Sequence, residues 1–346
     1  MCTVPLRETL KAYIDFMETN ALDPKIFPSV KELEREAVAE AGKLFSNPNA
    51  TGYITSGGTE SNIVALWIAR ELSGKKEVLA PVSVHYSVEK ACALLGLKFI
   101  PTPLGEDHRA DVEAMKEKMG PKTAAIVGTA GTTSLGLVDP IEEMAGIAGD
   151  RKCFFHVDAS FGGFVLPLMN YPKKWDFTLP QVSSIAADPH KMGMVPIPAG
   201  LLLFRRKRWL RVLERNVAYL GTKTQTLLGT RPGASVAATW VAFKLLEKRK
   251  KAIERCLELT KKLARGIQRI ETLDLITKPE LNIVAFKSEV LKIQSIEKAL
   301  ERRGWIVSRT ELPAGIRLVI MPHHSPSHIR SFLRDLKECV RELLSR

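Results

Sequence analysis

The chain has 346 residues, of which 45% are hydrophobic and 26% are charged, and its formal net charge is +13. This balance excludes a disordered chain, and the length allows two domains. No basic stretch leads into an apolar core at the N-terminus, and prolines break the longest apolar run, so we expect neither a secretory signal nor a membrane span. Five scattered cysteines without a CxxC pair favour a reducing, cytoplasmic setting over a disulfide framework or structural zinc site: Cys2, Cys92, Cys153, Cys256 and Cys339.

Apolar segments with a helical period predict an N-terminal helical region over 6–20 and 30–45. From residue 62 to 206, helical patterns alternate with apolar strands. The predicted helices cover 62–72, 87–97, 110–119 and 140–149, and the predicted strands cover 76–84, 98–104, 123–130, 152–159, 182–188 and 199–206. This alternation predicts an α/β fold whose mainly parallel sheet has helices on both faces.

The C-terminal part has a different makeup. A long helical stretch begins at about residue 234, and short strands and helices follow it: strands at 281–287, 304–310 and 315–321, and helices at 295–303 and 326–344. We therefore expect three parts: an N-terminal helical segment (1–45), a large domain (46–240) and a small α+β domain (241–346).

Basic residues are densest at 204–216 and 245–271. In the second segment, glutamates recur among the lysines on a helical period, which is typical of a solvated, ion-paired helix face. No nucleic-acid-binding motif accompanies the charge, so we expect no nucleic-acid partner.

Residues capable of chemistry lie at or just past the carboxyl ends of four predicted strands. They are His85, Thr129, Asp158 and the adjacent pair His190 and Lys191. Ligands of open α/β sheets bind at the carboxyl ends of the strands, where these residues would converge. Taken alone, Asp158 is equally well explained as a buried carboxylate that caps a turn or pairs with a nearby arginine, and Lys191 as an ordinary exposed lysine after a strand. Together they indicate a site in which a carboxylate needs a partner and a desolvated amine becomes a carbonyl nucleophile.

A glycine-rich turn at 55–62, TSGGTESN, precedes the helix at 62–72. Such a turn offers backbone N–H groups and the positive end of the helix dipole to a phosphate. It matches neither the dinucleotide-binding nor the P-loop pattern. A phosphate cradle, a lysine amine and a buried carboxylate together indicate a phosphorylated aldehyde cofactor.

Six segments occur in the order seen in one enzyme family. The chain resembles the group II decarboxylases among fold-type I pyridoxal-phosphate enzymes, and most closely their archaeal L-aspartate or L-tyrosine decarboxylase branch. The segments are TSGGTESN (55–62), SVHYSVEKA (83–91), GTAGTTSLGLVDP (128–140), HVDASFGG (156–163), DPHKMG (188–193) and GTRPG (229–233).

The resemblance implies pyridoxal 5'-phosphate as cofactor and assigns a role to each matched residue. Lys191 would hold the cofactor covalently, Asp158 would pair with its pyridine nitrogen, and His85 would stack on its ring; these are the predicted catalytic residues. Ser160 would pack on the other ring face, and Thr129 would approach the ring hydroxyl. The predicted phosphate neighbours are His190, Gly58 and Thr59.

The resemblance also implies a homodimer with active sites at the interface. Gly229 and Thr230 would bind the partner's cofactor, and Arg317 would bind the substrate α-carboxylate. The implied reaction is decarboxylation of an L-amino acid. We favour L-aspartate, giving β-alanine for coenzyme A synthesis, with L-tyrosine and L-glutamate as alternatives, because no identifiable residue reads the substrate side chain.

The proton donor is left open by the sequence. Many relatives use a loop tyrosine, but the stretch 219–233 holds only Tyr219, at its start, and Lys191 or His85 can serve instead. Relatives usually carry a longer N-terminal segment, so a truncated, non-catalytic relative is one alternative. A metal enzyme is another, although it leaves Lys191 without a role; its ligands would come from His156, Asp158, His190, His323, His324 and His328.

Overall fold

The computed structural model describes residues 4–345, which form two compact units. Unit 1 comprises the described residues up to Gly131 together with Val138–Lys250, and unit 2 comprises Thr132–Leu137 and the described residues from Lys251 onward. Helix α8 (Leu246–Ile267) begins in unit 1 and continues into unit 2. Within residues 4–345, no helix is both long and apolar enough to cross a membrane.

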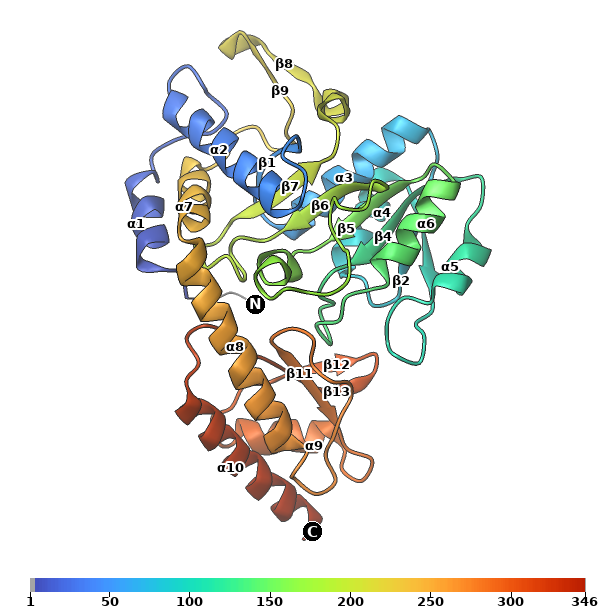
Figure 1. Ribbon diagram of the computed structural model, residues 1–346, viewed down its shortest axis with the longest axis vertical. Coiled ribbons are helices and arrows are strands. Elements are labelled where there is room, and N and C mark those ends of the chain that lie inside the picture. Colours follow the sequence, from blue (N-terminus) through green and yellow to red (C-terminus); the bar gives the residue numbers. More distant parts are fainter. Residues whose placement is uncertain (1–3, 346) are drawn as a thin grey trace. The chain divides into compact units, whose positions relative to one another are not determined.

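Unit 1 holds most of the secondary structure (Figure 1). Its α-helices are α1 (Arg7–Asp15), α2 (Pro28–Leu44), α3 (Gly58–Ser73), α4 (Tyr86–Leu95), α5 (Val112–Lys118), α6 (Ile141–Asp150) and α7 (Gly233–Lys244). Its strands are β1 (Thr51–Thr55), β2 (Glu77–Pro81), β3 (Lys98–Thr102), β4 (Thr123–Thr129), β5 (Phe154–Asp158), β6 (Val182–Ala187), β7 (Gly200–Phe204), β8 (Arg215–Val217) and β9 (Thr222–Thr224). Short 3-10 turns are η1 (Gly162–Phe164), η2 (Leu166–Leu168), η3 (Lys207–Leu213) and η4 (Ala218–Leu220).

A seven-stranded sheet forms the core of unit 1, with the order β1-β7-β6-β5-β4-β2-β3. Strands β3, β2, β4, β5 and β6 run parallel, and β7 is antiparallel to both β6 and β1. Every residue of β4, β5, β6 and β7 is buried, which explains their mainly apolar sequences. The predicted α/β fold with a mainly parallel sheet is confirmed.

Helices cover both faces of this sheet. Val127 and Phe154 belong to one buried cluster with the apolar side of α3. Gly128 faces the other way, because a Cβ on it would meet Ile141 and Met144 of α6. Since successive side chains of a strand alternate between faces, α3 and α6 lie on opposite sides of the sheet.

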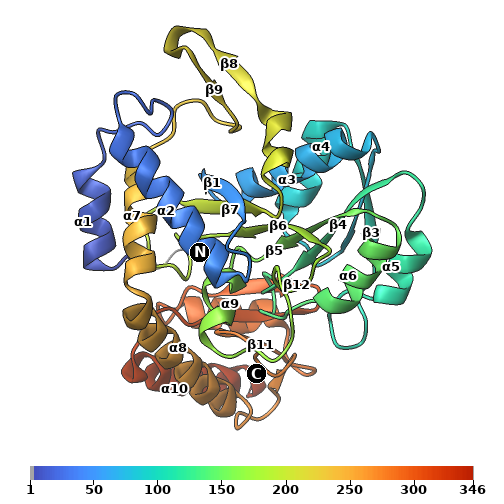
Figure 2. The same ribbon diagram turned by 45° about the horizontal axis from the view of Figure 1, so that its top comes forward.

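Two parts of unit 1 were absent from the sequence prediction. The first is β1, which pairs with β7 so closely that a Cβ at Gly52 would lie 1.8 Å from the carbonyl oxygen of Leu202. The second is the hairpin β8–β9, which both views show extending away from the sheet (Figures 1 and 2). Both are short, and the hairpin is partly exposed, so neither has the long apolar pattern that identifies a buried strand.

The strands of unit 2 are β10 (Asp274–Leu275), β11 (Ile283–Lys287), β12 (Ser308–Glu311) and β13 (Ala314–Val319), and its further helices are α9 (Ile293–Glu301) and α10 (Pro326–Leu344). The strands form an antiparallel sheet of order β10-β11-β13-β12. β12 begins later than the predicted strand at 304–310. The reason is Trp305, whose ring packs edge-on against Phe332 and whose indole nitrogen donates to Asp335 at 2.8 Å, which draws this stretch toward α10.

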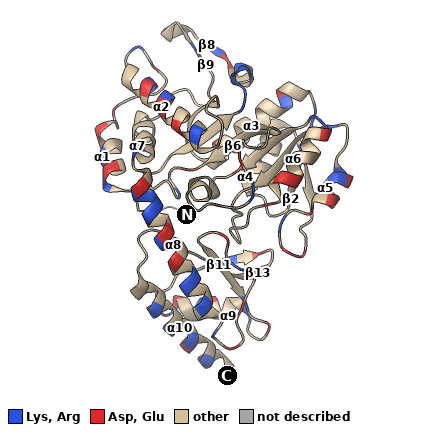
Figure 3. Cartoon of the chain, viewed as in Figure 1, with Lys and Arg blue, Asp and Glu red and all other residues tan. Residues whose placement is uncertain are grey.

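The charge of α8 follows the expected pattern. Basic and acidic residues are interspersed along this helix (Figure 3), while its apolar residues recur on a buried face that includes Ile253, Leu259 and Leu263. The helix is therefore amphipathic, and its charges of both signs lie on the solvated side.

One cation of α8 is an exception. Arg249 is fully buried, and none of its guanidinium nitrogens has a hydrogen-bond partner among the described residues. The guanidinium lies 5.1 Å from the ring centre of Phe164 and 5.7 Å from that of Phe243. Burial lowers its pKa to about 10. A desolvated ring contact of this kind contributes on the order of 2 kcal/mol, whereas an unpaired buried charge costs several kcal/mol.

We therefore expect Arg249→Met to raise the free energy of unfolding by about 1–3 kcal/mol, because Met keeps the unbranched stem and removes the charge. The matched control is Arg231→Met, which breaks the buried ion pair with Glu34 and should lower it by about 2–5 kcal/mol. Urea unfolding measures both. A loss of stability in Arg249→Met would contradict the expectation.

Candidate active site

The strand ends of unit 1 bring most of the predicted site residues to one edge of the sheet. Asp158 and Thr129 are the last residues of β5 and β4 and lie side by side in register. Lys191 follows the end of β6 by four residues, and His85 is the N-cap of α4. By strand alternation, Thr129 and Asp158 are on the face covered by α3. The predicted clustering at the carboxyl edge is what the fold produces.

Asp158 is the buried charge at the centre of this edge, with 4% of its surface exposed. Its carboxylate accepts hydrogen bonds from the side-chain amide of Asn62 at 2.8 Å and from the backbone N–H of Ser160 at 3.0 Å. Burial by itself raises the pKa of a carboxyl group. Here the hydrogen bonds from the backbone N–H of Ser160 and from Asn62, together with the charge of Lys191, outweigh burial, so the pKa of Asp158 lies below its usual range.

Lys191 lies beside a second carboxylate. Its Nζ is 2.9 Å from Oδ2 of Asp188, a residue that is 1% exposed. His190 stands on the same side of Asp188, with Nε2 at 3.7 Å from Oδ2, and its Nδ1 accepts from the backbone N–H of Ala199 at 3.2 Å. This bond fixes the ring of His190, and burial lowers its pKa. Asp188 was not among the predicted site residues.

The N-terminus of α3 is open toward these residues. No side chain caps it, and its N-cap Gly57 has a φ of 153°, which favours glycine. A Cβ on Gly57 would meet the ring of His190 at 3.1 Å, and one on Gly58 would lie 2.4 Å from Oγ of Ser160. Thr59 is half-buried on the first turn. The uncapped helix end thus lies next to the predicted phosphate neighbours.

Two hydroxyls of the predicted set are buried without a hydrogen-bond partner among the described residues. They are Oγ of Ser160 and Oγ1 of Thr129. Buried hydroxyls without partners are uncommon in folded proteins. Together with the uncapped helix end, they indicate that a polar, anionic ligand completes this edge of the sheet.

Sequence reasoning missed four residues that surround Asp158 and His85. They are Asn62, Ser87, His156 and Ser184, all fully buried and joined by hydrogen bonds of 2.7–2.8 Å. From the sequence alone, Asn62, the last residue of the glycine-rich motif, had no assigned role, and His156 was considered only as a metal ligand. A histidine inside an otherwise apolar strand, two residues before Asp158, was the available signal, because both side chains share a face.

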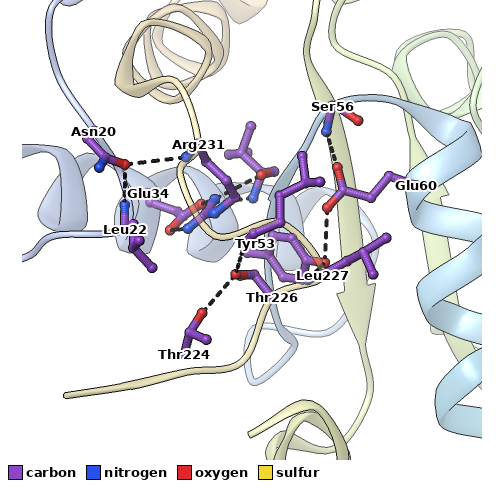
Figure 4. A network of polar contacts seen from close by, with 12 residues as sticks. Asn20, Leu22, Glu34, Tyr53, Ser56, Glu60, Thr224, Thr226, Leu227 and Arg231 are labelled. Carbon is purple, nitrogen blue, oxygen red and sulfur yellow. Dashed lines mark hydrogen bonds and ion pairs between the residues drawn. The ribbon is translucent and has the colours of Figure 1, made fainter. Parts of the chain in front are cut away.

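The second part of the predicted site, Gly229 and Thr230, is exposed on a loop that precedes α7. The loop is anchored by the next residue, Arg231 (Figure 4). Its guanidinium forms a two-point ion pair with Glu34, at 2.5 and 3.0 Å. It also lies 5.2 Å from the ring centre of Tyr53.

The same network reaches the first turn of α3. The hydroxyl of Tyr53 donates to Glu60 at 3.3 Å, and the other oxygen of Glu60 accepts from the backbone N–H of Ser56 at 2.7 Å (Figure 4). Burial raises the pKa of Tyr53, so its hydroxyl stays protonated and remains a donor. The exposed loop and the glycine-rich turn are therefore held by one continuous set of polar contacts.

Arg317 belongs to unit 2, on β13 opposite Ala285. It is half-buried, burial lowers its pKa to about 10, and its Nε has no hydrogen-bond partner among the described residues. Such a guanidinium is suited to an anionic partner.

The residues of the metal alternative are not arranged as ligands. Both ring nitrogens of His156 are occupied by Ser184 and Asn62. His328 is part of the capping box of α10, where its Nδ1 accepts from the backbone N–H of Ser325. Among residues 4–345, no group of three or more His, Cys, Asp or Glu side chains could hold a metal ion. The four described cysteines are free, and Cys2 lies outside the described residues.

Comparison with known families identifies the family to which the chain belongs. Residues 10–289 match the conserved domain of the pyridoxal-dependent decarboxylases. The chain belongs to this family. It is a pyridoxal-phosphate-dependent carboxy-lyase that acts on an amino acid, as the resemblance implied.

Curated relatives are similar over nearly their whole length. A probable L-tyrosine/L-aspartate decarboxylase of Methanothermobacter thermautotrophicus is 41% identical over 97% of this chain and 95% of its own. A probable L-aspartate decarboxylase of Archaeoglobus fulgidus is 39% identical over 99% of this chain and 94% of its own.

Solved structures agree with the fold. A sphingosine-1-phosphate lyase of Burkholderia pseudomallei superposes with a TM-score of 0.92 at 27% identity, covering 99% of this chain and 85% of that one. A glutamate decarboxylase of Lactobacillus brevis superposes with a TM-score of 0.91 at 22% identity, over 99% and 87% of the two chains. At that identity, the second likeness concerns the fold alone.

The decarboxylase site fits its cofactor. The uncapped N-terminus of α3 is suited to a phosphate, and Ser160 and Thr129 have hydroxyls that lack partners. Asp158 is an ionised acceptor that a protonated pyridine nitrogen can satisfy, and Lys191 provides an amine at the same edge.

The close approach at Gly58 yields a direct test. In Gly58→Ala, the new Cβ would lie 2.4 Å from Oγ of Ser160 and 3.1 Å from Oδ2 of Asp188. We expect the displacement of these groups to lower the free energy of unfolding by about 1–3 kcal/mol and to weaken pyridoxal-phosphate retention about tenfold.

The matched control is Gly146→Ala on α6, where an added Cβ meets no neighbouring group within 4 Å. It should leave cofactor retention unchanged and stabilise the helix by up to about 1 kcal/mol. Urea unfolding and the loss of visible absorbance during dialysis are the measurements. Wild-type retention in Gly58→Ala would refute the proposed cradle.

Proposed function

We propose that the enzyme decarboxylates L-aspartate to β-alanine in the cytoplasm and thereby serves coenzyme A biosynthesis. The supporting observation is the sequence identity, 41% and 39% over almost the whole chain, to two relatives whose names both include L-aspartate decarboxylase. L-Tyrosine is the second candidate, because the name of the Methanothermobacter relative includes it. L-Glutamate is the third candidate, and its only support is that the chain belongs to the pyridoxal-dependent decarboxylases.

We assign the site residues as follows. Bound pyridoxal phosphate supplies an electron sink for the electron pair left on Cα when CO₂ departs. Asp158 keeps the proton on the pyridine nitrogen, because its carboxylate is ionised and buried. Lys191 is the attachment point, and the carboxylate of Asp188, 2.9 Å from its Nζ, holds the amine at this edge of the sheet. His85 packs against the ring.

The remaining site residues bind and orient. Gly58, Thr59 and His190 hold the phosphate, with Ser160 and Thr129 at the ring. Arg317 binds the substrate α-carboxylate, which is supported by its unsatisfied Nε. Tyr219, on η4 at the tip of the hairpin, is 82% exposed. This exposure gives it no place in a water-excluding site within its own chain, so we favour His85 or Lys191 as proton donor.

The substrate proposal is tested by CO₂ release from L-aspartate, L-tyrosine and L-glutamate. We expect kcat/KM for aspartate to exceed those for the other two by at least about tenfold. Lys191→Ala should abolish turnover, and borohydride should fix the cofactor on the wild-type peptide that contains Lys191. Arg317→Met should lower kcat/KM by about 100-fold or more because the carboxylate loses a charged partner. Preferred turnover of tyrosine would overturn the aspartate proposal but leave the decarboxylase assignment intact.

We also propose that the enzyme is a homodimer in which Gly229 and Thr230 complete the partner's site. Both residues are exposed, yet the loop is fixed by the buried ion pair of Arg231 and Glu34. The N-terminal region offers an apolar surface for the same assembly, because Leu10, Ile14 and Met17 are exposed in and just after α1 at helical spacing.

Mixing two inactive variants tests the shared site. Thr230→Asp should repel the cofactor phosphate, and Lys191→Ala lacks the attachment point. If the loop serves the partner, each mixed dimer has one intact site. Random reassembly of equal amounts then restores about one quarter of wild-type activity. Unmixed preparations are the control. No recovery despite confirmed subunit exchange would place Thr230 in its own chain's site.

A further inference from the structure

The side chain of Asn62 connects three groups of the site. Its Nδ2 donates to Oδ2 of Asp158 and to Oγ of Ser87, both at 2.8 Å, and its Oδ1 lies 2.8 Å from Nε2 of His156. Asn62 is fully buried on α3, between the strand end that carries Asp158 and the start of α4. An amide has two donors and one acceptor atom, and all of them are used here.

Asp158 decides which way this amide faces. An ionised carboxylate only accepts hydrogen bonds, so the amide nitrogen must be directed toward it. The amide oxygen then faces His156, which must donate from Nε2. The other ring nitrogen of His156, Nδ1, is therefore an acceptor for the hydroxyl of Ser184 at 2.7 Å. Burial lowers the pKa of His156 to about 4, which agrees with a neutral ring.

The same reasoning extends through Ser87 to His85. Because Ser87 Oγ accepts from Asn62, its own hydrogen is free to be donated, and Nδ1 of His85 lies 2.8 Å away. The backbone N–H of Ser87 also points to this Nδ1, at 3.3 Å. Two donors therefore converge on Nδ1 of His85. A neutral imidazole that accepts at Nδ1 must carry its proton on Nε2.

We propose that Asn62 is a positioning residue: the ionised Asp158 fixes its amide, and through Ser87 this holds His85 in the tautomer with the proton on Nε2. His85 then presents an N–H group, not a lone pair, on the side away from Ser87. Its significance for catalysis depends on the proposed function, in which His85 packs against the ring. There it makes His85 a proton donor at Nε2 and excludes it as a base at that atom.

The test is the ring ¹⁵N spectrum of the full chain labelled on histidine, recorded near neutral pH with bound pyridoxal phosphate and after its removal. In the wild type, we expect His85 and His156 each to show protonated Nε2 and unprotonated Nδ1. In Ser87→Ala, the Nδ1–H population of His85 should rise about tenfold because one hydrogen bond to Nδ1 is lost. His156 should not change.

Ser184→Ala is the matched control, because it removes an equally buried hydroxyl that contacts only the far side of the network. It should alter the signals of His156 and leave those of His85 unchanged. Ser87→Thr keeps the hydroxyl and should restore the wild-type tautomer. In the loaded enzyme, Ser87→Ala should lower kcat about tenfold with KM unchanged.

A wild-type His85 with its proton on Nδ1 would overturn the proposal, whether or not the variants fold. An unchanged His85 spectrum in Ser87→Ala would overturn it as well. The spectrum of the cofactor-free chain separates this proposal from the function on which it depends. A correct tautomer with no aspartate turnover would refute only the function, and a wrong tautomer with normal turnover would refute only the role of Asn62.

Discussion

The ionised carboxylate of Asp158 is the constraint on which the site depends. A charge with so little exposure costs several kcal/mol unless donors surround it, and the fold supplies them from separate parts of the chain. The N–H of Ser160 comes from the turn after β5, the amide of Asn62 from α3, and the positive charge from Lys191 after β6. These segments must therefore be placed together before the carboxylate is tolerated. The same demand orients the buried side chains around it.

The strands that carry the site were predictable because they lie inside the sheet. The parallel strands β4, β5 and β6 are buried on both faces, so their sequences are mainly apolar. Polar residues at or just past the ends of these strands mark the carboxyl edge, which is why Thr129, Asp158 and Lys191 could be placed there from sequence. The edge pairing of β1 and the hairpin β8–β9 leaves no comparable pattern.

The supporting residues could not be predicted for a different reason. Asn62 and His156 are 94 positions apart, and their contact exists only because α3 covers the face of β5 on which His156 lies. Ser87 and Ser184 gave no signal in the sequence, because serine is common in helices and strands and its presence does not indicate a polar partner. Pairing of this kind is set by helix-on-sheet packing, which composition and periodicity do not encode. The same holds for Arg249, whose place in a charged helix predicted a solvated side chain.

The first turn of α3 has a consequence for how such sequences can diverge. Glu60 faces the network of Tyr53 and Arg231, while Asn62, two residues later, faces Asp158. One rigid turn thus serves both the exposed loop and the buried carboxylate. A substitution that moves α3 to improve the contacts of Glu60 also moves Asn62 away from Asp158, and the reverse holds as well. Single substitutions in either set of contacts therefore impair the other set. Descendants of this chain would be expected to keep both sets or to exchange them together.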